Sequence, residues 1–487
     1  MITVATPRRC NKNEFDSVAE PFLQGDGLPF ANVLDAESIQ RVFREEAALF
    51  GQDDIFSTEI VLWAFLAQAL RDGKGAACSS AVDEIATSML QTGRRSPSGD
   101  TGDYCRARAK LSLPALRRLV VESGRQLEGN ADKSWLWKGL HAKLVDGFTF
   151  TLPDTPENQE AFPQLRSQDR GVGFPIARAV TVMSLATACV CDAAVGPYQG
   201  KQTGENALLR DVLDAFDAGD VVVFDRYYCS FMMLAMLSLG GAQVCARLHQ
   251  RRFCDFRRGR RLGRDDHLIT WARPARPPWM SQEEYECIPR TLALRELRFD
   301  VTVPGSRTEV LTVITTLTDT EAYSREDIAE LYGMRWNVEL DIRAVKQTLG
   351  LDHVRCKTPE MVRRELWVTL LAYNLIRKLI ATSAAIHGKQ PRRLGFARAC
   401  QTVLASWMLL STGSCSNARA MHGMMLAHIA DNEVANRPGR IEPRVLKRRR
   451  KAFDRSRGED VRYMDGLGTA TKSGDEISIV PAVAGGC

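Results

Sequence analysis

The chain has 487 residues, 45% of them hydrophobic and 25% charged, which are the proportions of an ordinary globular protein with two or three domains. Its net charge of +6 excludes a uniformly polycationic protein, although basic residues are concentrated in residues 247–264 and 444–457. Such clusters can follow a phosphate backbone, and they can equally be solvated loops or tails.

The 13 cysteines are scattered and include no CxxC pair. This pattern predicts reduced thiols and argues against both a disulfide scaffold and a structural zinc site. The sequence shows no apolar signal core, and no stretch is long and apolar enough to span a bilayer. We therefore expect a cytoplasmic protein without a membrane partner.

Residues 1 to about 135 are predicted to be mainly helical, with helices beginning near Ile60, Asp83 and Leu111. A basic segment that includes Tyr104 and Arg108 follows a Gly/Ser/Pro-rich loop and is expected to start a further helix. A small helical module of this kind can bind DNA or another protein, and its sequence does not decide between them.

From about residue 140 the pattern changes to short apolar runs that alternate with helical spacing. The expected elements are a strand from residue 143, two strands within 177–195, a helix over 205–216, a strand over 221–224, a helix over 231–239 and a strand over 242–248. This order predicts an α/β sheet. Residues 250–318 are interpreted as a β-rich insertion, 365–380 as a helix, and the chain after Asn432 as a poorly ordered tail.

A helix is predicted to carry Tyr332, Arg335, Glu339 and Lys346 on one face. Ser324 and Asp327 form a capping pair upstream, and no Gly or Pro interrupts residues 334–349. On a continuous helix the four side chains fall within an arc of about 60°. One carboxylate among two cations and a phenol suits metal and phosphate binding. The alternative is a solvated face with intrahelical salt bridges.

Two acids, Asp146 and Asp225, are expected at the C-terminal sides of apolar strands, where active-site groups of α/β sheets gather. Glu339 would supply a third carboxylate, and several converging carboxylates are what two metal ions on a phosphodiester require. An acid that ends a strand is also a common turn residue or helix cap. Four further acids compete for the same role: Asp154, Asp220, Asp266 and Asp341.

The spacing of Tyr332, Arg335, Glu339 and Lys346 matches the YREK signature of DDE transposases, and the chain resembles the IS-four family of these proteins. Asp146-Gly147 with the downstream run Leu-Pro-Asp-Thr-Pro-Glu-Asn is similar to the family's first-aspartate region. Phe224-Asp225-Arg226-Tyr227 resembles its second-aspartate region. The resemblance covers roughly residues 55 to 455.

The resemblance implies an α/β fold with an RNase H-like mixed-sheet core, a β-rich insertion, an N-terminal helical domain and a C-terminal helical region with a basic tail. The corresponding domain boundaries are 1–135 (helical, for DNA binding or dimerisation), 136–248 and 319–385 (catalytic core), 249–318 (insertion) and 386–487 (C-terminal region).

The implied activity is that of an insertion-sequence transposase that cuts and joins element ends, with a hairpin intermediate. Asp146, Asp225 and Glu339 would hold two Mg2+ ions, with Mn2+ as a substitute. Tyr332, Arg335 and Lys346, with the adjacent Trp336, would contact DNA.

A tryptophan of the insertion, Trp271 or Trp279, would stack on a flipped base; the alternative is an ordinary packed aromatic side chain.

The implied partners are the terminal inverted repeats, target DNA and a second copy in a synaptic homodimer at the bacterial nucleoid. The alternatives are a non-catalytic DNA-binding protein derived from a transposase and a structure-specific RNase H-like nuclease.

Overall fold

The computed structural model describes residues 34, 36–51, 54–91, 95–167, 169, 171–300, 310–411 and 418–434. The basic cluster at 444–457 and the predicted tail after residue 434 lie outside the described residues. Within the described part, no helix combines the length and the apolar character that crossing a membrane requires.

The N-terminal part is mainly helical over its described residues, from residue 34 on, as predicted. Its helices are α2 (Ala36–Glu45), α3 (Thr58–Ala69), α4 (Cys78–Gln91), α5 (Gly102–Arg108) and α6 (Leu113–Gly129), with short 3-10 turns at Gly73–Ala76 and Lys133–Trp135. Ser57 and Ser112 begin α3 and α6 by accepting hydrogen bonds from backbone N–H groups three residues on. Helix α3 is apolar around nearly its whole circumference, which is why it is buried on all sides.

The strands of the described residues form one nine-stranded sheet at the centre of the molecule, in the order β3-β2-β1-β4-β5-β9-β8-β7-β6. The strands are β1 (Ala142–Thr151), β2 (Ile176–Ser184), β3 (Val190–Pro197), β4 (Val221–Phe224), β5 (Gln243–Arg247), β6 (Arg260–Gly263), β7 (Asp266–Ala272), β8 (Thr291–Asp300) and β9 (Val310–Thr315). β1, β2 and β3 pair antiparallel, and β4 and β5 run parallel to β1. This mixed order is that of an RNase H-like core and confirms the predicted α/β class.

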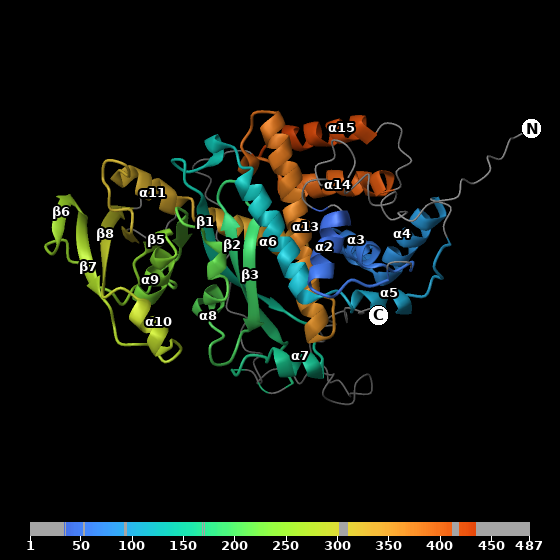
Figure 1. The fold of residues 1–487 in the computed structure, drawn as a ribbon, viewed down its shortest axis with the longest axis horizontal. Helices are drawn as coiled ribbons and strands as arrows, with labels where there is room; N and C mark the ends of the chain where they lie inside the picture. The colour runs from blue at the N-terminus through green and yellow to red at the C-terminus, as the bar shows by residue number, and fades with distance from the viewer. Residues whose placement is uncertain are drawn as a thin grey trace, which may run out of the picture.

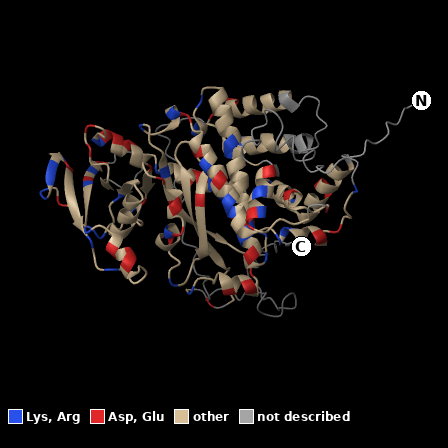
Figure 2. Cartoon of the chain, in the orientation of Figure 1, with Lys and Arg blue, Asp and Glu red and all other residues tan. Residues whose placement is uncertain are grey.

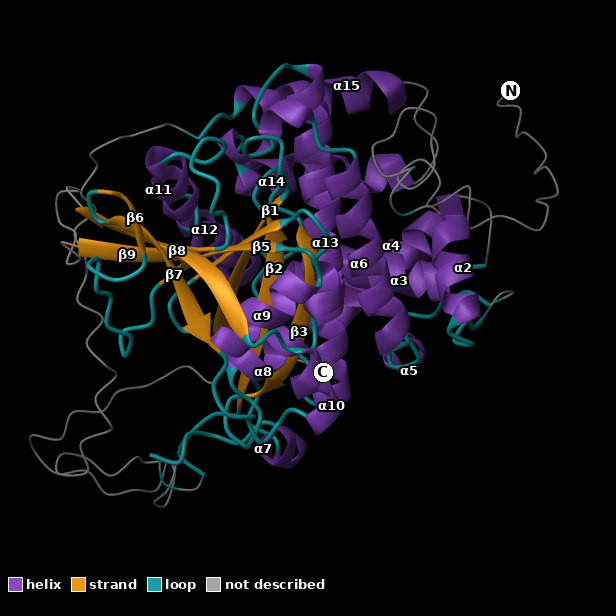
Figure 3. Cartoon of the chain, turned by 60° about the vertical axis from the view of Figure 1, so that its left-hand side comes forward, coloured by secondary structure: helices purple, strands orange, loops and turns teal. Residues whose placement is uncertain are grey.

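The insertion is β-rich, as predicted, and its strands belong to the same sheet as the core. β9 pairs with β5 of the core, and β8, β7 and β6 follow it outward. Figure 3 shows the strands running on from the core into the insertion. The arginines of β6 therefore lie at the sheet edge farthest from the N-terminal helices (Figures 1 and 2).

The remaining helices are α7 (Pro156–Ala161), α8 (Glu205–Arg210), α9 (Phe231–Leu239), α10 (Gln282–Cys287), α11 (Arg325–Gly333), α12 (Trp336–Arg343), α13 (Pro359–Ile386), α14 (Phe396–Ser411) and α15 (Ala418–Asp431), with 3-10 turns at Leu213–Ala215 and Pro391–Arg393. In Figure 1, α6 and α13 stand between the sheet and the other N-terminal helices, α2 to α5. Asn374 of α13 connects α13 to β3 and α6 by hydrogen bonds. Its side-chain amide accepts from the Val190 N–H of β3 and donates to the Val190 carbonyl, and it also donates to the Val120 carbonyl and the Ser123 hydroxyl of α6.

The sheet separates two apolar cores, since alternate residues of a strand face opposite sides. Leu144 and Val223 belong to the larger core, which includes residues of α2 to α6 and of α11 to α13. Val145 and Phe224 belong to the smaller core, formed with α8 and α9. The two faces of β1 and β4 are therefore covered by different helices.

The predicted helix over 205–216 is wrong in its length. α8 ends at Arg210, and a 3-10 turn follows at Leu213–Ala215. The backbone leaves helical geometry at Val212, whose φ is −129° and whose side chain is fully buried. Packing of this valine into the smaller core thus overrides the helical spacing of the segment.

Candidate active site

Asp146 within β1 and Asp225 directly after β4 occupy equivalent positions along two neighbouring parallel strands. β1 and β4 pair with Val145 opposite Phe224, and the next residue on each chain is an aspartate. Because equivalent residues of parallel strands face the same side, both carboxylates are directed like Leu144 and Val223, toward the side of α11 and α12. The parallel register thus brings together two acids 79 residues apart.

The prediction that Asp146 ends its strand is wrong. β1 continues to Thr151 because it remains paired with β2, and Asp146 lies opposite Thr181 of that strand. Only the parallel partner β4 ends at this level, at Phe224. Asp146 is therefore at the end of the β1–β4 pairing but inside β1.

Arg335 joins the sheet to α12. Its Nη1 lies 3.5 Å from Asp146 Oδ2, and its Nη2 donates to Glu339 Oε1 at 2.8 Å. The three side chains are half-buried. The third acid is thus held beside the first by a guanidinium that touches both.

The environment of Asp146 disfavours its ionised form. Burial, helped by the neighbouring carboxylates of Glu339 and Glu205, raises the pKa of this carboxyl to about 6, against the opposing effects of a hydrogen bond from the Gly147 N–H and of the charge of Arg335. Such crowding of acids is a common property of sites that bind cations.

A fourth carboxylate, that of Glu205, lies near enough to Asp146 to raise its pKa, and it was not predicted from the sequence. It begins α8, accepts a hydrogen bond from the Tyr228 hydroxyl at 3.2 Å, and lies 3.9 Å from Arg178 Nε. Its side chain covers Gly147, the residue after Asp146. The absence of a side chain at Gly147 is the only sequence signal, and it identifies no partner.

The predicted continuous helix from Tyr332 to Lys346 is wrong, because the segment is divided. α11 ends at Gly333 and α12 begins at Trp336. Between them the backbone N–H groups of Asn337 and Val338 donate hydrogen bonds to the carbonyls three residues earlier, those of Met334 and Arg335. The side-chain amide of Asn337 donates to the Met334 carbonyl as well. The chain then widens into a π-helical turn over Ala344–Thr348. The capping box of Ser324 and Asp327 is confirmed.

Tyr332 and Lys346 consequently reach the sheet from different elements. Tyr332, on α11, is 7% exposed, and burial is the main cause of the raised pKa of its hydroxyl, to which Asp225 contributes. Lys346, on the π turn, donates to the Thr149 carbonyl at 3.0 Å and pairs with Asp352 at 2.9 Å. π turns inside helices occur frequently at functional sites.

The tryptophans considered from the sequence differ in exposure. Trp336 is 54% exposed, whereas Trp271 is 7% exposed and carries the Arg252 guanidinium 3.5 Å above its ring. Trp279 is half-buried beside Arg210, whose guanidinium lies 3.9 Å from the ring centre.

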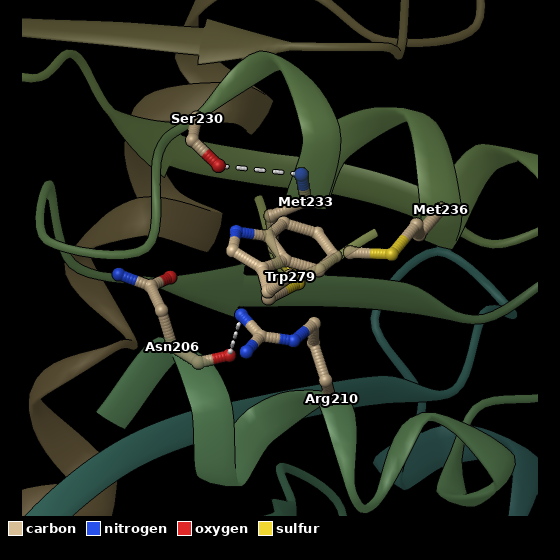
Figure 4. A pocket seen from close by; sticks show the side chains of 6 residues that line it. All are labelled: Asn206, Arg210, Ser230, Met233, Met236 and Trp279. Atoms are coloured by element: carbon tan, nitrogen blue, oxygen red, sulfur yellow. Dashed lines mark hydrogen bonds between the residues drawn. The ribbon is translucent and has the colours of Figure 1, made fainter. Parts of the chain in front are cut away.

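Trp279 borders a cavity of about 190 Å³ between α8 and α9. Its lining consists of Asn206, Arg210, Ser230, Met233, Met236 and Trp279. Figure 4 shows the indole against the Arg210 guanidinium, with Met236 beside the ring.

The competing acids have partners elsewhere. Asp220 pairs with Lys143 at 2.6 Å, and Asp266 is held by two bonds from Arg295. Asp341 is buried between Arg377 and Arg392. Asp154 is exposed and accepts a hydrogen bond from the Gln159 amide.

Residues 137–375 match the family model described as "Transposase DDE domain". The chain is 27% identical over 442 residues to the transposase InsG for insertion sequence element IS4 of Escherichia coli K12, which spans 90% of this chain and 94% of the relative. The chain belongs to the IS-four family of DDE transposases. Members of this family cut and join DNA in a metal-dependent reaction, so this transposase is a DNA-binding enzyme.

Two further similarities are more limited in extent or in closeness. A segment of 71 residues is 38% identical to the putative transposase InsL for insertion sequence element IS186A of Escherichia coli K12, over 15% of this chain and 19% of the relative. The solved structure of a piggyBac transposase synaptic complex with hairpin DNA aligns over 87% of each chain, with 10% identity and a TM-score of 0.40.

Proposed function

We propose that this insertion-sequence transposase uses Asp146, Asp225 and Glu339 to hold two divalent cations, Mg2+ physiologically and Mn2+ as a substitute. The observation that carries this assignment is the β1–β4 register, since it aligns the two aspartates on the face that α12 covers. The contact of Arg335 with both Asp146 and Glu339 supports the inclusion of the glutamate.

The donor set suits hard cations. Three carboxylates, with Glu205 close by, offer only oxygen, which Mg2+ and Mn2+ prefer. The raised pKa of Asp146 fits the same view, because a bound cation would stabilise the ionised carboxylate that burial and its acidic neighbours disfavour. When bound, such ions activate the attacking oxygen and stabilise the leaving oxygen in phosphodiester cleavage and joining.

The cationic side chains around the acids are proposed to position the DNA backbone. Arg335 sits within the acidic group, and Lys346 lies along β1 beyond Asp146, at the Thr149 carbonyl. Both can donate to phosphate oxygens. Tyr332 is only 7% exposed and offers little surface to DNA, whereas Trp336 is 54% exposed beside Arg335.

For the flipped base of a hairpin intermediate, Trp279 is the better candidate of the two insertion tryptophans. One face of the Trp271 ring is covered by Arg252 and the side chain is buried. Trp279 instead borders a cavity on α8, the helix that Glu205 begins. A base could stack there only by displacing or joining Arg210.

The proposal extends to the partners that cut-and-paste chemistry requires. These are the inverted repeats that end the element, a target DNA at the bacterial nucleoid, and a second copy of the chain that pairs the two ends. The domain boundaries expected from the sequence remain part of this proposal, with the N-terminal helices as the candidate end-binding or dimerising module.

The test is incubation of the purified protein with Mg2+ or Mn2+ and a DNA fragment that carries its gene and both flanks. Paired cuts at inverted repeats are expected, lost in Glu339→Gln and retained in Asp154→Asn, a matched change of an exposed acid. Salt-sensitive binding without cuts would favour a non-catalytic DNA-binding derivative. Cleavage without joining would favour a structure-specific nuclease, and cuts made equally by Glu339→Gln would refute the glutamate assignment.

A further inference from the structure

A second cluster of metal-ligating side chains lies in the insertion. Cys254 follows β5 in the arginine-rich segment, His267 is on β7 and Glu296 is on β8. His267 and Glu296 are direct cross-strand partners in the antiparallel β7–β8 pair, so their side chains share one face. The sulfur, the imidazole nitrogen and a carboxylate oxygen all lie within 4.8 Å of one another.

The cluster is buried, and without a cation two hydrogen-bond acceptors in it face each other. Cys254, His267 and Glu296 are 9%, 1% and 3% exposed. The carbonyl of Arg258 can only accept, so the Nδ1 of His267, 2.7 Å away, carries a proton. In a neutral imidazole the lone pair of Nε2 then faces Glu296 Oε2, itself an acceptor, at 3.0 Å.

A divalent cation resolves this conflict. We propose that Cys254, His267 and Glu296 bind a zinc ion through Sγ, Nε2 and a carboxylate oxygen. The thiol loses its proton to solvent on binding, and the thiolate and carboxylate charges together balance those of the ion. The bond from His267 Nδ1 to the Arg258 carbonyl is the usual outer contact that orients a metal-bound histidine.

The geometry needs only small side-chain adjustments. The sulfur and the imidazole nitrogen lie 2.9 and 3.0 Å from Glu296 Oε2, and 3.9 Å from each other. Tetrahedral zinc with ordinary bond lengths separates such ligand atoms by about 3.4 to 3.6 Å. A thiolate with an imidazole selects zinc over the Mg2+ or Mn2+ expected at the catalytic carboxylates. Three protein ligands leave the fourth position to water.

The ion would fasten the arginine-rich segment to the sheet. Cys254 lies two residues after Arg252, which covers Trp271 of β7, and four residues before Arg258, whose carbonyl contacts His267. The isolated positions of the three ligands, 13 and 29 residues apart, explain why the sequence argued against zinc: no pair of ligands is close along the chain.

The first measurement is the zinc content of the full-length protein after removal of loosely bound metal, followed by replacement with Co2+. We expect one zinc per chain and, with Co2+, the absorption that sulfur-to-cobalt charge transfer produces. Cys254→Ser and His267→Gln should each weaken zinc binding by more than about tenfold and abolish or shift this absorption.

The controls separate this site from the catalytic one. Cys287→Ser changes an exposed cysteine of the same insertion and should leave the absorption intact. Glu339→Gln should also leave it intact, because the catalytic acids provide no sulfur. Folded wild-type protein without zinc and without the cobalt–sulfur absorption would overturn the proposal and favour a buried imidazolium–carboxylate pair. Zinc retained equally by both ligand variants would overturn it as well.

Discussion

A Cβ atom on Gly147 would lie 2.6 Å from the Cδ of Glu205, so the Glu205 side chain can keep its present position only while residue 147 is glycine. Gly147→Ala must therefore move the Glu205 side chain or the strand next to Asp146. Because small displacements at a reacting centre are costly, we expect a loss of at least about tenfold in Mn2+-dependent cleavage. Gly129→Ala, at an open position ending α6, is the matched control. Full activity in Gly147→Ala would show that Glu205 is free to move without consequence.

The pKa of Asp146 predicts a pH-dependent stability. In the metal-free protein this carboxyl titrates near pH 6, above its ordinary value of 3.8, so the unfolded chain ionises first as pH rises. The free energy of unfolding is therefore not reduced by Asp146 below about pH 4. It decreases as the pH rises from about 4 to about 6, because over this range the unfolded chain ionises more readily than the folded protein. Above about pH 6 the Asp146→Asn variant should therefore be more stable than the wild-type protein, with a free energy of unfolding higher by on the order of 1 to 3 kcal/mol. Near pH 4 the two proteins should differ little.

Urea unfolding in a chelator at two pH values measures this difference. Addition of Mn2+ should reverse the order above pH 6, because only the wild-type protein gains the binding energy of a complete carboxylate set. A stability difference that is the same at both pH values would contradict the assignment.

Asp341 distinguishes structural acids from catalytic ones. Its carboxylate is 2% exposed and pairs with Arg377 at 3.1 Å and Arg392 at 2.9 Å. Asp341→Ala leaves two cations without their partner, and we expect a loss of about 3 to 5 kcal/mol in unfolding free energy. Calorimetry on the folded variant should give unchanged Mn2+ affinity. A stable variant with weakened Mn2+ binding would place Asp341 in the metal site.

Lys346 should affect DNA more than metal. Its amine lies at the Thr149 carbonyl and Asp352, away from direct contact with the three proposed ligands. Lys346→Ala is expected to weaken binding of element ends and to lower the slope of log affinity against log salt by about 1, with Mn2+ affinity unchanged. An unchanged salt dependence would mean that no phosphate contact is made by this side chain.

Asn374 should be essential for the packing of α13. Its side chain donates to and accepts from Val190, and donates to Val120 and Ser123, all within the buried layer. Asn374→Ala leaves several backbone groups without partners, so we expect a destabilisation of about 2 to 3 kcal/mol by urea unfolding. Gln401→Ala on the exposed face of α14 should cost little by comparison.

The strands were predicted well because buried β runs are local signals, and the assignment of the three acids as metal ligands remains a prediction from their motifs. Asp146, Asp225 and Glu339 are recognisable from their motifs, and the register of β1 with β4 accounts for the proximity of the first two. The break between α11 and α12 was not predicted although Gly333 is a common helix-ending residue, because the Gly- and Pro-free span from residue 334 favoured a continuous helix.

Features that depend on contacts between distant elements were missed as well. Glu205 matters because it covers Gly147 of another strand, and no spacing along the chain relates the two. Arg252 covers one face of the Trp271 ring, and the ligand cluster of the insertion depends on the β7–β8 register. Tertiary pairing, which periodicity does not encode, determines each of them.

The continuity of the nine-stranded sheet has a mechanical consequence. β5 is hydrogen-bonded to β4, whose next residue is Asp225, and on its other side to β9 of the insertion. A force applied to the insertion by bound DNA would travel through these ladders as strain rather than be absorbed by a hinge. An insertion grafted from another transposase would therefore have to keep the β5–β9 register that pairs Cys245 with Thr315. A shifted register would displace β5 and β4 and with them Asp225.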